Sequence, residues 1–272
     1  MLFCCKKLLK KFLKKFVVTI DITTRQVYNI VVIEKVTTNR FTFSLFKIIQ
    51  NKNYSTQFSG GIIMKIAVVC ANGKAGQLIT KEAVNRGFDV TAFVRGENKS
   101  AAKNTVTKDL FDITKEDLNG FDVVVDACGG WTAETIPVIP KAGEYLCNLL
   151  AGTDTRLVIV GGAGSLYVNP EHTITVADGK DFPDAFKPLA AAHQVLLDGL
   201  RKRNDVKWTY VSPAGDFQAD GERTGEYTLG GEELVLNSKG ESVISYADYA
   251  IAFVDEIANG NHIGERISVV SK

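Results

Sequence analysis

The sequence lacks the features of several well-known classes of protein. It has no run of 18 apolar residues, so no conventional membrane-spanning helix is expected. Its five cysteines show no paired spacing of the kind that binds zinc, and its three histidines are isolated from one another. We therefore expect no metal site and take each histidine as structural. Cysteines scattered in this way fit a reducing cytoplasm and give no support for a disulfide framework.

The first 63 residues contain no alanine, proline or tryptophan. They hold 11 Lys and Arg residues against two Asp and Glu, whereas residues 64–272 hold 21 against 29. The acidic charge of residues 64–272 argues against a general nucleic-acid-binding protein, because such proteins neutralise phosphates with excess Lys and Arg.

The composition of residues 1–63 suggests translated upstream DNA. Lys, Phe, Ile, Asn and Tyr have AT-rich codons, whereas the Ala and Gly that become common from Met64 have GC-rich ones. Gly60-Gly61 can be encoded by GGAGGA, a ribosome-binding sequence at a suitable distance before Met64. We expect the natural protein to begin at Met64, and N-terminal sequencing of the natively expressed protein would test this. Alternatively, residues 6–16 form a basic amphipathic helix at a membrane surface, and residues 27–36 and 41–49 form strands.

The main functional signal lies in residues 65–78. An apolar, β-rich run ends at Cys70 and is followed by Gly73 and Gly76, after which a helical pattern begins. This pattern is typical of dinucleotide binding, because glycines let the backbone approach the pyrophosphate and free N–H groups at the helix N-terminus bind its charge. Lys74 would add positive charge. The alternative is an ordinary tight turn between a strand and a helix.

Arg95 predicts which dinucleotide is preferred. It ends the next strand about 20 residues after the glycines, where such folds place the residue that contacts the adenosine ribose. An acidic residue there favours NAD, whereas a cation suits the 2′-phosphate of NADP. We therefore expect NADPH to be preferred over NADH. The alternative is a solvated surface arginine.

Strands and helices alternate from Met64 to Ser212. The strands are expected at 65–70, 89–94, 105–108, 121–126, 157–160 and 208–211, and the helices near 75–86, 98–104, 136–151 and 184–203. Such alternation predicts a parallel sheet covered on both faces, which is the doubly wound, Rossmann-type α/β class. After Pro213 we expect a β-hairpin from 224–229 and 233–236, a helix over 246–259 and a strand over 267–270, forming a small cover on the substrate side.

Other strand ends carry further candidate site residues. Asp109 could flank the adenine, although it is more often a turn former. Gly129 ends the fourth strand, where the nicotinamide ribose is expected, or makes a simple turn. Gly161 and Ser165 belong to a Gly-Gly-Ala-Gly-Ser segment with room for a flat ligand, and the Ser165 hydroxyl could bind a carbonyl of substrate or nicotinamide. The alternative is a flexible glycine loop. Tyr210 is expected in the core.

These motifs resemble the atypical short-chain dehydrogenase/reductase group. Residues 64–272 are most similar to its NAD(P)H-binding, NADH-flavin reductase-like branch, related to biliverdin reductase B. The resemblance rests on the segments 71–76, 94–95, 160–166, 208–214 and 223–231. It implies a cytoplasmic reductase that transfers a hydride from NADPH to a flavin-like (FMN or FAD) or quinone-like acceptor.

The chain departs from the family pattern in two ways. Cys70 stands where the usual phosphate turn has glycine, and no Tyr is followed four residues later by Lys. That Tyr-Lys pair is the usual catalytic pair of short-chain dehydrogenases, so its absence argues against ordinary alcohol or sugar-epimerase chemistry. Hydride transfer to a flavin or quinone needs no such pair, because proximity and orientation suffice. The alternative is a non-enzymatic redox sensor that binds the dinucleotide without turnover.

Overall fold

The computed structural model describes residues 31–38, 41–48 and 63–272 of the chain. The chain divides into two units, Met1–Ser55 and Thr56–Lys272. Within the first unit, β1 (Val31–Thr38) pairs antiparallel with β2 (Phe41–Ile48). The two strands predicted in this region are therefore confirmed, with β1 beginning later than expected. The predicted basic helix at residues 6–16 lies outside the described residues.

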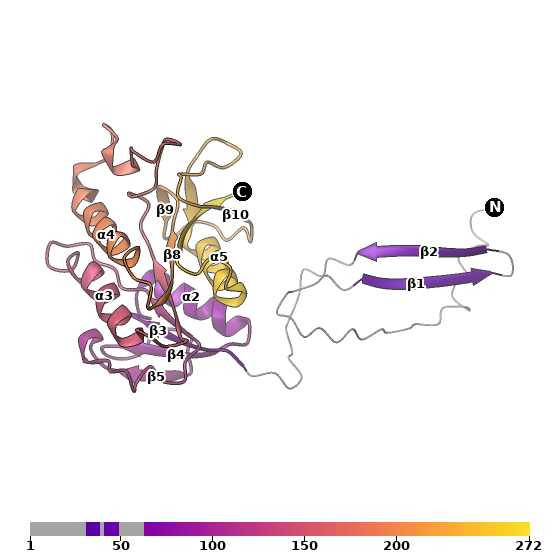
Figure 1. The fold of residues 1–272 in the computed structure, drawn as a ribbon, viewed down its shortest axis with the longest axis horizontal. Helices are drawn as coiled ribbons and strands as arrows, with labels where there is room; N and C mark the ends of the chain where they lie inside the picture. Colours follow the sequence, from indigo (N-terminus) through magenta and orange to yellow (C-terminus); the bar gives the residue numbers. More distant parts are fainter. Residues whose placement is uncertain (1–30, 39–40, 49–62) are drawn as a thin grey trace. The chain divides into compact units, whose positions relative to one another are not determined.

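Eight strands of the second unit form one sheet (Figure 1). Their order is β10-β12-β8-β7-β6-β3-β4-β5, and all neighbours are parallel except β10 and β12. The strands are β3 (Lys65–Val69), β4 (Asp89–Val94), β5 (Asn104–Thr107), β6 (Val123–Asp126), β7 (Arg156–Val160), β8 (Lys207–Ser212), β10 (Tyr227–Gly230) and β12 (Glu265–Ser271).

Two pairs of helices cover the two faces of this sheet. α2 (Lys74–Asn85) and α5 (Tyr246–Asn259) pack together on one face, and α3 (Val138–Leu150) and α4 (Lys187–Leu200) pack together on the other (Figure 1). Because successive strand residues point to opposite faces, Val68 joins the core under α2 and α5 while Val69 joins the core under α3 and α4. The predicted doubly wound α/β class is confirmed.

The direction of the chain through the sheet reverses between β3 and β6. From β3 the chain builds outward through β4 and β5, and it then returns to place β6, β7 and β8 on the other side of β3. In open α/β sheets, ligands bind at the carboxyl ends of the strands beside such a reversal. The segments that follow β3 and β6 are therefore the natural place for a site.

Two predicted elements are wrong. Residues 98–104 form no helix, because the Asn98 side chain bonds to the backbone and side chains around it: it donates to the Ala102 carbonyl and accepts from the Ser100 N–H. Residues 224–229 and 233–236 form no hairpin, because β10 pairs instead with β12, with Tyr227 opposite Ser271.

The C-terminal elements mostly extend the sheet instead of lying over it. β12 pairs with β8 and carries β10 as the edge strand, while β9 (Asp216–Gln218) and β11 (Val243–Ser245) form a small separate pair. The predicted helix begins after Ser245, whose hydroxyl accepts the Asp248 N–H at 3.0 Å. It ends at Gly260 in a left-handed conformation, as expected for a C-cap.

Gly76 is required by packing within this fold. A Cβ at Gly76 would lie 2.7 Å from the Cys70 carbonyl oxygen, whereas a Cβ at Gly199, in α4, would meet no atom within 4 Å. We expect Gly76→Ala to lower the free energy of unfolding by about 1–3 kcal/mol, because backbone atoms must move apart. Gly199→Ala should instead be neutral or stabilising by up to about 1 kcal/mol. Urea unfolding measures both, and equal effects of the two substitutions would contradict this account.

Candidate functional site

The glycine-rich turn joins β3 to α2 at the sheet reversal. The Gly73 N–H donates to the Cys70 carbonyl at 3.0 Å, and α2 begins at Lys74 with no side-chain cap on its first turn. The first N–H groups of a helix have no partner within the helix, so the start of α2, after the carboxyl end of β3, offers donors of the kind that can bind an anion. A Cβ at Gly73 would make only ordinary contacts at 3.4 Å or more. The fold therefore tolerates a Cβ at Gly73, and packing within the protein does not require glycine there.

Asn72 holds this turn against the segment that follows β4. Its amide nitrogen donates to the Glu97 carbonyl at 2.8 Å, and its amide oxygen accepts the Lys99 N–H at 2.7 Å. Gln77 in turn donates to the Asn72 carbonyl at 2.8 Å. These bonds position the glycine-rich turn relative to the segment that follows β4. The residue types alone did not single out Asn72, although an amide directly before a glycine of the predicted turn was the available signal.

Arg95 and Lys74 are both exposed at the same edge of the sheet. Arg95 directly follows β4, which pairs with β3, and Lys74 is the first residue of α2. Neither side chain forms an ion pair with any residue that the structure describes. Two cations beside a helix N-terminus suit a ligand with several phosphate groups.

Asp109 and Gly129 lie where they were predicted, after β5 and β6. The Asp109 carboxylate caps a short 3₁₀ helix, Leu110–Asp112, by accepting the Phe111 N–H at 3.1 Å. This is the turn-forming role that was its alternative, and a contact with adenine stays a prediction. Gly129 is exposed with nothing within 4 Å of a Cβ.

Packing accounts for the glycines that follow β7. A Cβ at Gly161 would lie 2.4 Å from the Tyr210 ring, one at Gly162 would lie 2.8 Å from the His193 ring, and one at Gly164 would lie 2.7 Å from the Cβ of Ala190. α4 and β8 therefore press directly against this segment. The segment is a tightly packed surface, and a cofactor role for Gly161 stays a prediction.

Ser165 is buried and already partnered. Only 3% of it is exposed, and its hydroxyl oxygen accepts from Nη1 of Arg266 at 3.0 Å. Arg266 also donates to the Ser165 carbonyl and to the carbonyl and carboxylate of Glu232. The hydroxyl proton of Ser165 is still free to donate, so its predicted role remains open, but its orientation is set by Arg266. No motif in the sequence pointed to Arg266.

Tyr210 lies in the core, as predicted, and carries a polar network. Its hydroxyl accepts the Gly162 N–H at 2.9 Å and forms a hydrogen bond with Nδ1 of His193 at 3.1 Å. Burial raises the Tyr210 pKa and lowers the His193 pKa to about 4, so both side chains are neutral near pH 7. The network fixes the backbone at the end of β7 without introducing charge.

Cys70 and Cys128 form a disulfide, with their Cα atoms 5.2 Å apart. The expectation that the scattered cysteines form none is therefore wrong. The two residues are 58 positions apart, but each follows one of two paired strands, β3 and β6, and so they meet at the sheet edge. The cytoplasmic location stays a prediction, and cysteine usage no longer supports it.

Asp126 is a buried carboxyl group at the end of β6. It accepts the Cys128 N–H at 3.0 Å, and burial raises its pKa from 3.8 to about 7. The buried free thiol of Cys147 in α3 has its pKa raised to about 12 by burial. Burial disfavours the charged form of both groups.

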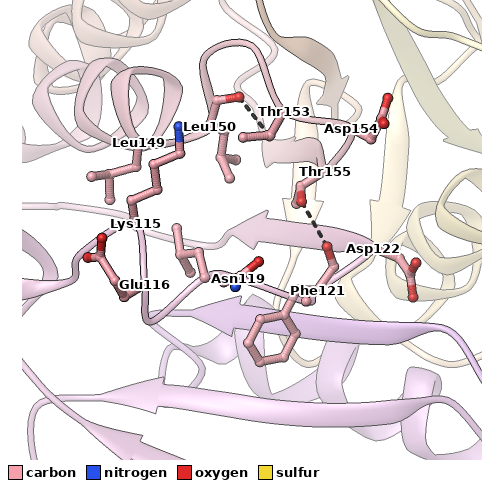
Figure 2. A pocket seen from close by; sticks show the side chains of 12 residues that line it. Lys115, Glu116, Asn119, Phe121, Asp122, Leu149, Leu150, Thr153, Asp154 and Thr155 are labelled. Atoms are coloured by element: carbon pink, nitrogen blue, oxygen red, sulfur yellow. Dashed lines mark hydrogen bonds between the residues drawn. The ribbon is translucent and has the colours of Figure 1, made fainter.

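A hollow of about 540 Å³ lies at the other end of the strands, beside the amino ends of β6 and β7 (Figure 2). It is bounded by the segments before β6 and β7, where the Thr155 hydroxyl donates to the Phe121 carbonyl at 2.8 Å. Lys115, Glu116 and Asp154 stand around it (Figure 2). It contains none of the predicted site residues, and the amino ends of parallel strands are not where α/β sheets bind cofactors.

No group of three or more His, Cys, Asp and Glu side chains in the part of the chain that the structure describes is placed to hold a metal ion. No helix within that same part is both long enough and apolar enough to cross a bilayer.

Known proteins resemble this chain in sequence or in fold. Residues 70–259 match the family described as NAD(P)H-binding. YwnB of Bacillus subtilis, an uncharacterized protein, is 42% identical over 212 residues, which is 77% of this chain and 99% of YwnB. The crystal structure of SP1627 from Streptococcus pneumoniae, "a putative NADH-flavin reductase", is 55% identical with a TM-score of 0.75, covering 77% of this chain and 100% of SP1627.

A third similar protein is described with a different activity. The crystal structure of "the putative epimerase" from Bacteroides thetaiotaomicron is 32% identical with a TM-score of 0.68, covering 77% of this chain and 98% of that one. The same fold therefore accompanies more than one described chemistry, and the site must decide between them.

The burial of Asp126 predicts a dependence of stability on pH. Since its pKa is raised to about 7 in the folded protein, the folded state binds this proton more tightly than the unfolded state. This term lowers the free energy of unfolding as pH rises from about 4 to about 7, by up to about 4 kcal/mol. His193, with its lowered pKa, has the opposite slope between about pH 4 and 6.5.

We expect Asp126→Asn to remove the contribution of Asp126 to the pH dependence of stability and to leave the contribution of His193. The unfolding free energy of the variant, measured by urea at several pH values from about 4.5 to 7.5, should therefore rise more steeply with pH than that of the wild type. His193→Gln is the matched control and should give the shallower or falling curve. Parallel curves for wild type and Asp126→Asn would show that the Asp126 pKa is not raised.

Proposed function

Because the chain belongs to the NAD(P)H-binding family, we propose that it is an NADPH-dependent reductase that passes a hydride to a flavin-like or quinone-like acceptor. The observation that carries this proposal is the uncapped N-terminus of α2 at the sheet reversal, with the exposed Gly73 before it and the exposed Arg95 on the adjoining strand end. A dinucleotide with an additional ribose phosphate matches these groups in charge and order.

Each predicted site residue has a proposed part in holding the cofactor. Gly73, Lys74 and the helix that Gly76 allows to pack closely would bind the pyrophosphate, and Arg95 would bind the 2′-phosphate. Asp109 would lie beside the adenine. The two glycines at the ends of β6 and β7, Gly129 and Gly161, would border the nicotinamide end.

We propose that a flat acceptor binds at the nicotinamide end. Trp131, 70% exposed, follows β6 in sequence, and Val168 and Phe186, both exposed, belong to segments after β7. Exposed apolar side chains such as these would pack against an isoalloxazine or quinone ring by stacking and burial. SP1627, the similar protein described with flavin reduction, supports this class of acceptor.

The proposed reaction needs little acid–base catalysis by side chains of the protein. Bound NADPH supplies the hydride, and the protein supplies proximity and orientation. Ser165, held by Arg266, would donate its hydroxyl proton to a carbonyl of nicotinamide or acceptor. Tyr210 is already committed to Gly162 and His193, so it is not a free proton donor for an alcohol or ketone. Water can protonate a reduced flavin or quinone.

The activity can be measured directly on the full chain. We expect NADPH oxidation, followed at 340 nm, to depend on added FMN or a soluble quinone and to be faster with NADPH than with NADH. Gly73→Ala tests the binding site. Its Cβ fits the fold, so the protein should fold normally, but it should bind NADPH at least about tenfold more weakly. Tight NADPH binding without oxidation across flavins and quinones would favour the non-enzymatic sensor.

Arg95 should determine the preference between the two cofactors. Removing one charge-assisted contact with the 2′-phosphate, about 1.5–3 kcal/mol, should weaken NADPH binding by about 10- to 100-fold in Arg95→Ala. NADH affinity should change little, because NADH has no such phosphate. Lys103→Ala, another exposed cation, is the matched control and should alter neither affinity. Unchanged NADPH affinity in Arg95→Ala, measured by fluorescence titration, would show that this residue does not bind the phosphate.

A further inference from the structure

The Cys70–Cys128 disulfide joins the two strands between which the sheet reverses. Cys70 directly follows β3 and opens the glycine-rich turn, while Cys128 follows β6 and precedes Gly129. Cys70 is partly exposed, whereas Cys128 is 6% exposed. A small reagent in solution therefore reaches Cys70 first.

The backbone of Cys70 shapes the turn that would bind the dinucleotide. Cys70 has a φ of +61°, a left-handed conformation that glycine adopts freely and that a residue with a Cβ adopts at a cost. Its carbonyl accepts the Gly73 N–H, and the same oxygen is the atom against which Gly76 packs. Any rotation of the Cys70 peptide group would therefore move both glycines.

We propose that Cys70 and Cys128 are a reversible thiol/disulfide pair that sets the affinity of this turn for the dinucleotide, the disulfide form binding more tightly. The inference rests on the proposed function only in that the turn binds NADPH, and it requires no turnover. The physical basis is pre-organisation: the bond to the buried Cys128 holds Cys70 in the conformation that presents the turn.

The chemistry is exchange with a small disulfide such as oxidised glutathione. The Cys70 thiolate attacks one sulfur of the small disulfide, forms a mixed disulfide and releases one thiol. The Cys128 thiolate then attacks the Cys70 sulfur, forms the protein disulfide and releases the second thiol. Two electrons pass from the protein to the small disulfide, and the two protein thiol protons end on the two released thiols. A small dithiol reverses both steps.

Reduction frees Cys70 from its unfavourable conformation. The bonds of Asn72 still hold the middle of the turn, so we expect a partial loss of order and no unfolding. If the binding-competent conformation falls to about a fifth of the population, the apparent dissociation constant for NADPH rises about fivefold.

The experiment titrates the full chain with NADPH, followed by fluorescence, after equilibration with either oxidised glutathione or dithiothreitol. Differential alkylation and peptide mapping report the state of each cysteine in the same samples. We expect the Cys70 and Cys128 peptides to be protected together in the oxidised sample, and the reduced sample to bind about fivefold more weakly.

Three variants distinguish the effect of the disulfide bond from the effect of the left-handed conformation at residue 70. Cys128→Ala cannot form the bond and should bind as weakly as the reduced wild type in both conditions. Cys70→Gly also lacks the bond but tolerates the left-handed conformation, so it should restore tight binding in both conditions. Cys147→Ala, at the buried free thiol in α3, should retain the full redox response.

Several results would overturn the inference. These are equal NADPH affinity in the two conditions with the disulfide shown to form, tighter binding by the reduced form, or a stable glutathione adduct on Cys70 with Cys128 still free. Tight binding by Cys128→Ala would also overturn it. Absence of NADPH binding in every state and variant would be a different failure, because it would remove the proposed function itself.

Discussion

The pairing of β3 with β6 is the contact on which the rest of the structure depends. These strands are parallel, with Val69 opposite Asp126, and they lie at the buried centre of the eight-stranded sheet. The chain leaves β3 toward one edge of the sheet and leaves β6 toward the other. Because α2 covers one face and α3 the other, the two strand ends at this point are left uncovered by the helices that follow them.

Space and packing divide the glycines of the site into two groups. Gly76, Gly161 and Gly162 are in close contact with protein atoms, so the fold itself excludes a side chain there. Gly73 and Gly129 have room for a Cβ, so packing within the protein does not by itself require glycine there. In the proposed function, these two positions are where the cofactor would approach the backbone.

Buried polar side chains hold the floor of the site in place. Arg266 anchors the segment after β7 by donating to Ser165. The Tyr210 hydroxyl, which is bonded to His193, holds the Gly162 backbone. Asp126 holds the Cys128 backbone. Burial keeps the Tyr210 and His193 side chains neutral at neutral pH. In the proposed function, the exposed cations Lys74 and Arg95 would attract the phosphates, while this fixed segment would border the nicotinamide end.

The sequence by itself determined the class of fold and the position of the turn, because these depend on local periodicity. Apolar strands alternating with helices predicted the doubly wound sheet, and the glycines after the first strand of that sheet predicted where α2 begins. The local pattern wrongly predicted a helix at residues 98–104, where the Asn98 side chain competes for backbone hydrogen bonds. It also wrongly predicted a hairpin between 224–229 and 233–236, because β10 pairs instead with β12 near the end of the chain. Only the tertiary structure decided which distant residues meet: Arg266 with Ser165, His193 with Tyr210, and Cys70 with Cys128. These contacts depend on the order of the strands in the sheet. That order is a property of the whole sheet, so it cannot be read from a short stretch of sequence.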